Sequence, residues 1–447
     1  MTMPSAGVGA EAGDLPAAAS EVLPYGAPEP PPEPPPLRTP AVAVVGAGPS
    51  GLRAAAGLAA VLGGDVLVLD RGEEPGGVPR LCLHLGFGIR DLHRFYSGAV
   101  YAEILASRAA KAGAQLVTRA TVSGMSPDGV LRVASPTGPF DVAARATILA
   151  TGARERQSAA WWAPGGRPVG VYTTEELLET VQVQHLRVGA RAVIVGADMA
   201  GWAAACALKQ AGCRTVLMTT AYPAPGVSRL ISAPGKRWLG TLVSTCTRLT
   251  RVLGDGRVRA VEVQDVRHGI KGIVECDTVV FASDWIPERG LAQGAGVALD
   301  PHTLGPAVDA GLRTDHDGIF AIGDVAHPVD TADGASLDGA HVAPQVIQYL
   351  QGHGAGVGTV PIVPGRWLAW VSPSRFAPHG VAPSRGLVSA WPTRLFRRPQ
   401  ITAVQNGHEI GHATSRCPAA PGRVFRIPFS VVRAADREGG PVTIEVD

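Results

Sequence analysis

The sequence carries no excess of charge of either sign. Its 447 residues include 40 basic and 38 acidic side chains, which leaves a formal net charge of +2. A chain that binds nucleic acid or an anionic membrane surface through its overall electrostatic field needs a clear positive excess. We therefore expect no nucleic acid and no membrane among its partners, and we expect a small molecule or a protein as its ligand.

Cysteine is scarce, and no two cysteines stand close together in the chain. Zinc sites and ferredoxin-type clusters are held by cysteines at short, regular spacings. The sequence has no C-x-x-C pair and therefore predicts no metal site. Scattered free thiols suit a reducing compartment. The six cysteines are Cys82, Cys206, Cys213, Cys246, Cys276 and Cys417.

Long hydrophobic runs are missing as well. No stretch of about 18 uninterrupted apolar residues occurs, which is the length that a membrane-spanning helix requires. The N-terminal residues lack the basic start and apolar middle of a secretory signal. We expect a soluble, cytoplasmic protein.

Proline is concentrated in the N-terminal segment, residues 1–39, which contains the run PEPPPEPPP. Consecutive prolines favour an extended polyproline conformation that buries little apolar surface. We predict that this segment is a disordered, proline-rich tail. The alternative is that its prolines form a ligand for a recognition module.

A strand, a glycine-rich turn, a helix and a second strand follow one another from Ala41 to Asp70, in AVAVVGAGPSGLRAAAGLAAVLGGDVLVLD. A second unit of the same kind, ARAVIVGADMAGWAAACALKQAGCRTVLM, begins at Ala190. Apolar strands that alternate with helices favour parallel sheets covered by helices. We therefore predict an α/β fold with two Rossmann-like dinucleotide-binding domains.

The first unit contains the motif Gly46-x-Gly48-x-x-Gly51 directly between its strand and its helix. In such a turn Gly46 permits the tight bend, Gly48 lets a pyrophosphate approach the backbone, and Gly51 lets the helix pack on the strand. The start of the helix offers free N–H groups to the anion. Asp70, at the end of the second strand, can accept hydrogen bonds from ribose hydroxyl groups. These residues predict a dinucleotide site.

The second unit departs from this pattern. Its turn reads Gly196-Ala197-Asp198-Met199-Ala200-Gly201, so that an aspartate replaces the middle glycine. The carboxylate of Asp198 would repel a pyrophosphate, unless it turns away and caps the helix. The following strand ends in Met218-Thr219-Thr220, without an acid for a ribose, and the next arginine further along the chain is Arg229. We therefore predict that NAD(P) binding in this domain is uncertain and that its site is degenerate.

Three segments in this order resemble the flavoproteins with two dinucleotide-binding domains, in the superfamily of the pyridine nucleotide-disulfide oxidoreductases. They are VVGAGPSGL with Asp70, ILATGARE at 148–155, and GIFAIGDVA at 318–326. The resemblance implies that FAD is the cofactor and that its ADP half binds to the first unit. It also implies that Thr151 and Gly152 cross beneath the cofactor, and that Gly323 and Asp324 hold its ribityl or pyrophosphate part.

With this resemblance the domains can be assigned. We expect an FAD-binding domain in two parts, a second and possibly degenerate Rossmann-like domain between them, and a small β-rich C-terminal domain. Their bounds are 40–155 and 285–355 for the FAD-binding domain, 156–284 for the second domain, and 361–447 for the C-terminal domain.

A further segment, GGVPRLCLHLGFGIRDLHRFYSGAVYAEIL at 76–105, resembles the flavoprotein subunits of opine oxidase, dye-linked proline dehydrogenase and hydrogen cyanide synthase. Those proteins usually work as heteromers, so the resemblance implies a second flavoprotein or an iron–sulfur subunit as a partner. After Asp324 only Cys417 occurs, and a cluster bound by this chain itself is therefore not expected.

Cys82 and His84 are the candidates for catalytic side chains. Both follow the first unit and can line the flavin as a thiolate and as an acid or base, although a buried cysteine and a hydrogen-bonded histidine are the alternative. A disulfide reductase needs two cysteines that exchange with a disulfide beside the flavin. Because Cys82 stands alone in this segment, we expect that the chain is not a disulfide reductase.

Other side chains give weaker signals. Trp161, Trp162 and Trp285 can belong to a substrate or partner surface, or to the core. Asp338 and His341 are expected at the start of a helix over 337–350, where a positive helix dipole can face the flavin.

Three functions are compatible with these residues. The first is an FAD-dependent oxidoreductase that passes hydride or electrons through flavin N5 and oxidises an amine or amino acid as one subunit of a heteromer. The second is an NAD(P)H-dependent flavin reductase of a small acceptor, and the third is a non-catalytic subunit that holds FAD as an electron relay. Asp198 and the missing ribose acid favour the first function.

Overall fold

The structure, a computed structural model, describes residues 35–155, 168–227, 237–283, 285–328, 331–353 and 358–447. The predicted tail up to residue 34 therefore lies outside the described residues, and so do Trp161, Trp162 and Arg229. Residues 36–447 form one compact unit.

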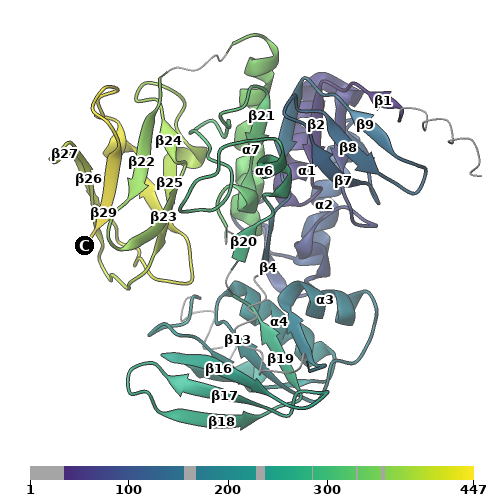
Figure 1. Cartoon of the computed structure of the whole chain (residues 1–447), viewed down its shortest axis with the longest axis vertical. Coiled ribbons are helices and arrows are strands. Elements are labelled where there is room, and N and C mark those ends of the chain that lie inside the picture. Colours follow the sequence, from purple (N-terminus) through teal and green to yellow (C-terminus); the bar gives the residue numbers. More distant parts are fainter. Residues whose placement is uncertain (1–34, 156–167, 228–236, 284, 329–330, 354–357) are drawn as a thin grey trace, which may run out of the picture. The chain divides into compact units, whose positions relative to one another are not determined.

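A five-stranded parallel sheet, in the order β21-β10-β2-β3-β6, lies at the centre of the first α/β domain (Figure 1). Its strands β2, β3 and β10 are buried along their whole length, as expected for a parallel sheet that helices cover on both faces. The strand bounds are Val42–Val45 for β2, Val66–Leu69 for β3, Gln115–Val117 for β6, Ala146–Leu149 for β10, and Ile319–Ala321 for β21.

Three helices pack on this sheet: α1 (Pro49–Leu62), α2 (Gly98–Lys111) and α7 (Ala332–Leu350). α1 and α7 approach each other closely because small residues line their contact. A Cβ atom added at Gly57 of α1 would lie 3.0 Å from the Cβ of Ala343 in α7, and one added at Gly339 would collide with the backbone of Ser50. The chain thus returns to the first α/β domain after it has formed the second domain.

A second sheet of this domain has the order β1-β9-β8-β7. Its first strand, β1 (Leu37–Arg38), falls within the segment 1–39 that we predicted as a disordered tail, so this prediction does not hold for its last residues. A proline cannot donate to a sheet but can accept, and the N–H of Asp141 donates to the carbonyl of Pro36 at 2.9 Å. The other bounds are Thr121–Met125 for β7, Leu131–Ala134 for β8 and Phe140–Val142 for β9.

The second α/β domain repeats the arrangement with a parallel sheet in the order β12-β19-β13-β14-β15, covered by α3 (Thr174–Gln182) and α4 (Met199–Gln210). An antiparallel layer, β16-β17-β18, belongs to the same domain (Figure 1). The parallel strands are Val171–Thr173 (β12), Arg191–Val195 (β13), Arg214–Thr219 (β14), Leu242–Ser244 (β15) and Thr278–Phe281 (β19); the antiparallel ones are Thr247–Leu253 (β16), Ala260–Asp265 (β17) and Lys271–Glu275 (β18). The predicted fold class, with two Rossmann-like domains, is confirmed.

Two short antiparallel strands, β11 (Ala153–Glu155) and β20 (Trp285–Pro287), connect the two α/β domains. Glu155, at the end of β11, is 4% exposed, and its carboxylate accepts a hydrogen bond of 2.8 Å from the N–H of Thr174 at the start of α3. Burial raises the pKa of Glu155 to about 7, although this helix N-terminus favours the ionised form. The side chain of Glu155 therefore fixes β11 to the start of α3, but its ionisation lowers the stability of the folded protein as the pH rises.

The C-terminal domain consists of two sheets, in the orders β24-β22-β29-β26-β27 and β23-β25-β28, around a core of its own. Asn406 and Gly407 form the hairpin turn between β26 and β27, and both have positive φ angles, 51° and 77°. The bounds are Val360–Pro364 (β22), Leu368–Ser372 (β23), Arg375–Phe376 (β24), Leu387–Pro392 (β25), Gln400–Gln405 (β26), His408–Thr414 (β27), Phe425–Pro428 (β28) and Val442–Val446 (β29).

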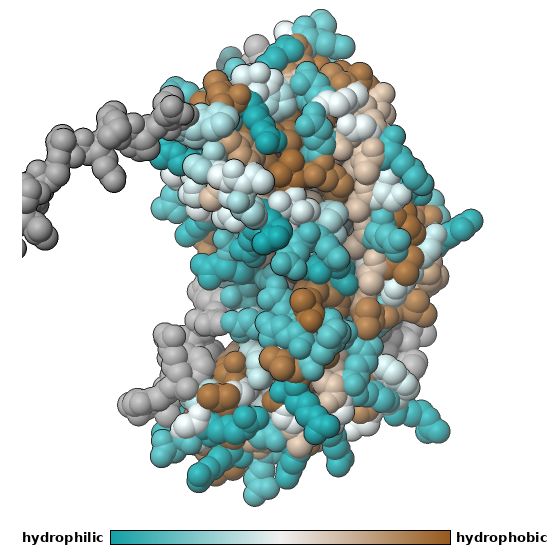
Figure 2. Space-filling view, turned by 90° about the vertical axis from the view of Figure 1, so that its right-hand side faces the viewer, coloured by the Kyte–Doolittle hydropathy of each residue, from teal (hydrophilic) through white to brown (hydrophobic). Residues whose placement is uncertain are grey.

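Hydrophobic residues on the face shown in Figure 2 form separate patches among hydrophilic ones. Within the described part of the chain, no helix combines the length and the apolar character that crossing a membrane requires.

We predict that Glu155→Gln stabilises the protein in a pH-dependent manner. An acid with a higher pKa in the folded than in the unfolded chain loses stability as the pH rises from its unfolded pKa, near 4.5, to its folded pKa, about 7. The neutral amide avoids this loss, which amounts to about 3 kcal/mol at most. Thermal unfolding at pH 5 and pH 8 should show a gain for the variant mainly at pH 8.

Glu179→Gln, on the exposed side of the same helix α3, is the matched control and should shift the unfolding temperature little at either pH. An equal shift for Glu155→Gln at both pH values would show that the ionisation of Glu155 does not carry the effect.

Candidate functional site

The turn between β2 and α1 has the geometry of a dinucleotide cradle. Gly46 has a φ angle of +109°, and an added Cβ would collide with the carbonyl oxygen of Ala150, which follows β10. A Cβ added at Gly51 would collide with the carbonyl oxygen of Gly46. The fold itself therefore requires these two glycines, whether or not a cofactor is bound.

Gly48 differs from Gly46 and Gly51, the other two glycines of the motif. Its backbone conformation is open to any residue, and an added Cβ would meet no atom within 4 Å. Gly48 caps α1 without any side-chain hydrogen bond, so that the N–H groups at the start of α1 receive no side-chain cap. An open space in front of an uncapped helix N-terminus fits the pyrophosphate of a dinucleotide.

Asp70 follows β3 at the same edge of the sheet. One carboxylate oxygen accepts a hydrogen bond of 2.6 Å from the N–H of Ala47, and the other accepts one of 2.7 Å from the N–H of Gly72. Asp70 thus fixes the glycine turn to the end of β3. Each oxygen keeps a further lone pair, which can accept from a ribose hydroxyl as the sequence predicts.

Thr151 and Gly152 follow β10, next to β2 in the sheet. The hydroxyl of Thr151 donates to the carbonyl of Glu288 at 2.8 Å, and the carbonyl of Gly152 accepts from the N–H of Glu288 at 2.9 Å. These bonds join the chain that leaves the first α/β domain to the chain that returns to it. Gly152 has a φ angle of +77°, and an added Cβ would meet no atom within 4 Å.

Gly323 and Asp324 begin the short helix η4 (Gly323–Val325), directly after β21. Gly323 has a φ angle of +68°, and an added Cβ would lie 2.9 Å from the hydroxyl oxygen of Ser50 in α1. Because β2, β10 and β21 are adjacent and parallel, their carboxyl ends share one edge. The fold therefore brings together the three segments that the sequence predicts for FAD.

The loop between β4 (Leu85–Phe87) and β5 (Tyr96–Ser97) is fixed to α7 by Asp333, which the sequence analysis missed. Its buried carboxylate accepts from the N–H groups of Gly88, at 2.7 Å, and Arg90, at 3.0 Å. A threonine followed two residues later by an aspartate was the available signal, since Thr331 caps α7 by accepting from the N–H of Gly334.

The position of α7 also corrects the prediction for Asp338 and His341. The helix begins at Ala332, five residues before the predicted start, so that both side chains lie within it. Asp338 is paired with His327, and His341 Nε2 lies 2.9 Å from the carbonyl oxygen of Ala310. His341 is thus held by the segment before β21 and does not stand at the helix N-terminus.

Cys82 is a buried thiol, 4% exposed, packed among residues of the second α/β domain. Burial, and after it the nearby Cys206, raises the pKa of Cys82 to about 12. A small cavity is lined by both cysteines, although they are far apart in the sequence. The thiolate that a catalytic role would use is therefore disfavoured in this state of the protein.

His84 stands beside the same cavity. Its Nδ1 lies 3.1 Å from the carbonyl oxygen of Leu85, and its buried Nε2 has no hydrogen-bond partner among the described residues. Burial lowers the pKa of His84. A neutral imidazole with one free nitrogen can accept or donate a proton, so the predicted acid–base role stays a prediction.

In the second α/β domain the start of α4 is covered by the chain itself. Asp198 caps the helix by accepting from the N–H of Gly201 at 3.1 Å, which is the alternative that the sequence left open. Gly226 packs on Asp198, and a Cβ added at Gly226 would lie 3.1 Å from the Cβ of Asp198 and 2.6 Å from the carbonyl oxygen of Gly422. The space in front of the helix start is open at Gly48 in the first domain. In the second domain the side chain of Asp198 and the backbone near Gly226 occupy it.

The comparisons with known proteins agree with the fold. The model of the pyridine nucleotide-disulphide oxidoreductase family matches residues 40–345, so this chain belongs to that family. A thioredoxin reductase of Treponema pallidum is 29% identical over 335 residues, covering 69% of this chain and 98% of that protein. A probable ferredoxin reductase of Castellaniella defragrans is 30% identical over 224 residues, covering 48% of this chain and 51% of that protein.

Two solved structures have the same fold. The thioredoxin reductase of T. acidophilum superposes with a TM-score of 0.59 at 22% identity, covering 70% of this chain and 99% of that one. The L-proline dehydrogenase of P. horikoshii superposes with a TM-score of 0.54 at 19% identity, covering 72% of this chain and 57% of that one. The chain is an FAD-dependent oxidoreductase of the family, and Gly46–Gly51, Thr151–Gly152 and Gly323–Asp324 are the segments that would hold the cofactor.

One expectation is corrected by these comparisons. The lone Cys82 led us to exclude a disulfide reductase, but thioredoxin reductases match this chain in sequence and in fold. The exclusion was therefore wrong.

We predict that Gly48→Asp yields a folded protein without FAD. The new side chain meets no protein atom near its Cβ, but its carboxylate would lie where a pyrophosphate binds. The visible absorption of the purified variant should fall at least tenfold, while its circular dichroism stays that of the wild type.

Gly272→Asp in β18 is the matched control, because Gly272 is exposed and an added Cβ there also meets no atom within 4 Å. A Gly48→Asp protein with full flavin content would refute the placement of the cofactor.

Proposed function

We propose that this protein oxidises an amine or amino-acid substrate and that it works as one subunit of a heteromer. When bound, FAD supplies hydride and electron transfer through N5 of its ring system. The chain contributes the uncapped start of α1 for a pyrophosphate and the carboxylates of Asp70 and Asp324 for hydroxyl groups. The electrons that reduce the flavin would then come from the amine or amino-acid substrate.

The closed start of α4 is the observation that carries this proposal. A nicotinamide dinucleotide at this position would meet the carboxylate of Asp198 and the backbone of Gly226. The strand before it, β14, ends at Thr219, with no acid to accept from a ribose hydroxyl. We therefore favour an electron donor that binds outside the start of α4 over NADH or NADPH.

The substrate class is suggested by the L-proline dehydrogenase of P. horikoshii, which shares the fold. It agrees with the resemblance of residues 76–105 to subunits of amine-oxidising flavoproteins. Oxidation of an amine removes a hydride from a C–H bond and a proton from the nitrogen, and a C=N bond forms. His84, with its free Nε2, is a side chain of this segment that can accept such a proton.

A partner subunit is favoured by the surface of the same segment. Five of its large apolar side chains are more than 40% exposed, an arrangement that is common at protein interfaces. They are Leu83, Leu85, Ile89, Phe95 and Val100. A second flavoprotein or an iron–sulfur subunit at this surface would accept the two electrons from the flavin.

A second candidate function is the NAD(P)H-dependent reduction of a small acceptor. It is favoured by the names of the relatives, which are reductases, and by one property of Asp198. Burial raises the pKa of Asp198 to about 6, so that the side chain is partly protonated in weakly acidic solution and repels a pyrophosphate less.

We predict that NADH and NADPH leave the flavin oxidised when each is mixed anaerobically with the purified protein at about pH 8. Asp198 is ionised at this pH and bars the nucleotide. The flavin absorption band should persist, whereas dithionite should bleach it and so prove that the cofactor can be reduced.

Rapid bleaching by either nucleotide would contradict the proposal and support the reductase. In that case the rate should be higher at about pH 5.5 than at pH 8, because protonation of Asp198 removes its charge. Asp198→Asn, which keeps the helix cap, should then react equally at both pH values.

A further inference from the structure

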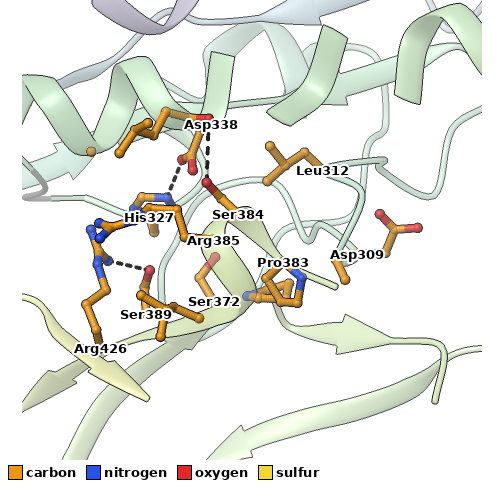
Figure 3. Close-up of a pocket in the computed structure, with 15 residues that line it drawn as sticks. Asp309, Leu312, His327, Asp338, Ser372, Pro383, Ser384, Arg385, Ser389 and Arg426 are labelled. Carbon is orange, nitrogen blue, oxygen red and sulfur yellow. Dashed lines mark hydrogen bonds and ion pairs between the residues drawn. The ribbon is translucent and has the colours of Figure 1, made fainter. Parts of the chain in front are cut away.

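A pocket lies between α7 and the C-terminal domain (Figure 3). It is a small pocket that is open to solvent. Polar side chains from three parts of the chain line it, together with apolar ones from the segment before β21 and from the C-terminal domain. Those used in the argument are His327, Asp338, Ser384, Arg385, Ser389 and Arg426.

Two arginines of the C-terminal domain extend towards the same end of this pocket, beside His327 (Figure 3). Arg426 in β28 donates from Nη1 to the hydroxyl of Ser389 in β25 at 2.5 Å. Arg385, in the turn η5 (Ser384–Gly386), has a left-handed backbone with a φ angle of +60°. Such a conformation is uncommon for a residue other than glycine.

The acids of the pocket already have partners. Asp338 pairs with His327 Nε2 at 2.7 Å, and both side chains are at most 10% exposed. One oxygen of Asp309 accepts from the N–H groups of Gly311, at 2.8 Å, and Arg313, at 2.9 Å. Arg385, in contrast, makes no hydrogen bond or ion pair to any residue that the structure describes. The pocket therefore presents a guanidinium group to a ligand.

We propose that this pocket binds a small aliphatic carboxylate. The two oxygens of a carboxylate match the paired N–H groups of a guanidinium. Leu312 and Leu387 in the lining offer apolar surface to the hydrocarbon part. A phosphate dianion fits less well, because its second charge would stand near the carboxylates of Asp309 and Asp338.

The pocket is connected to the predicted FAD segment by two elements. α7 turns Gly339 and Ala343 towards α1, whereas Leu337 and Asp338 line the pocket. The N–H of His327 donates to the carbonyl of Gly323 at 3.2 Å. A bound carboxylate would thus contact residues next to the cofactor segment. The inference itself rests on the pocket alone and does not require the proposed function.

The test is calorimetric titration of the FAD-loaded protein with sodium propionate, in parallel with inorganic phosphate and propylammonium chloride. We expect binding of propionate that Arg385→Gln weakens at least about tenfold, the loss expected for one charge-assisted hydrogen-bonding partner. Because Arg385 is exposed, this variant should fold and keep its flavin. Arg416→Gln removes the same charge from an exposed site outside the pocket and should bind as the wild type does.

Three results would overturn the assignment. They are the absence of propionate binding to the wild type, an Arg385→Gln variant with unchanged affinity, and binding of phosphate or propylammonium at least as tight as that of propionate. None of these measurements involves turnover, so their outcome is independent of the electron donor.

Discussion

The contact of the glycine turn with the ends of two neighbouring strands is the constraint on which the rest of the structure depends. Gly46 lies against the backbone of Ala150, and Gly323 lies against Ser50. No side chain fits at either place, so that the carboxyl ends of β2, β10 and β21 converge within one small region. The space left open at Gly48 and Gly152 is a consequence of this convergence, and it is the space that a dinucleotide fills.

The two α/β domains show how one residue changes the use of a common fold. In the first domain the helix N-terminus is bare and faces open space, whereas in the second it is capped by Asp198 and covered by Gly226. The glycines that close the turn, Gly196 and Gly201, are retained, and added Cβ atoms there would lie against the backbone much as in the first domain. The fold of the second domain is thus preserved independently of its ability to bind a nucleotide.

Much of this could be predicted from the sequence, because the relevant signals are local. The glycines of both turns and Gly323 lie between a buried strand and a helix, and their periodic surroundings predict the parallel sheets. The start of α7 was missed, since Gly334 weakens the helical pattern and the cap at Thr331 was not recognised. Leu37–Arg38 was assigned to the tail because prolines precede it, although a proline carbonyl can still accept from β9.

Features that depend on distant residues could not be predicted in this way. Arg385 and Arg426 come from a turn and a strand of the C-terminal domain, and only the fold places them beside His327. Cys82 and Cys206 are far apart in the sequence, and only the fold brings them near each other. Their burial, and with it the raised pKa of Cys82, is equally a property of the folded chain.

The central claim is that the first domain offers an open dinucleotide site and the second a closed one. The most direct test is a calorimetric titration with ADP, the half that FAD and NAD(P) share, into the protein with and without FAD. The account predicts one ADP site per chain in the FAD-free protein and none in the FAD-loaded protein. The account would be contradicted if ADP binds to the FAD-loaded protein and binds more tightly to the Asp198→Asn variant, because the second site would then be accessible.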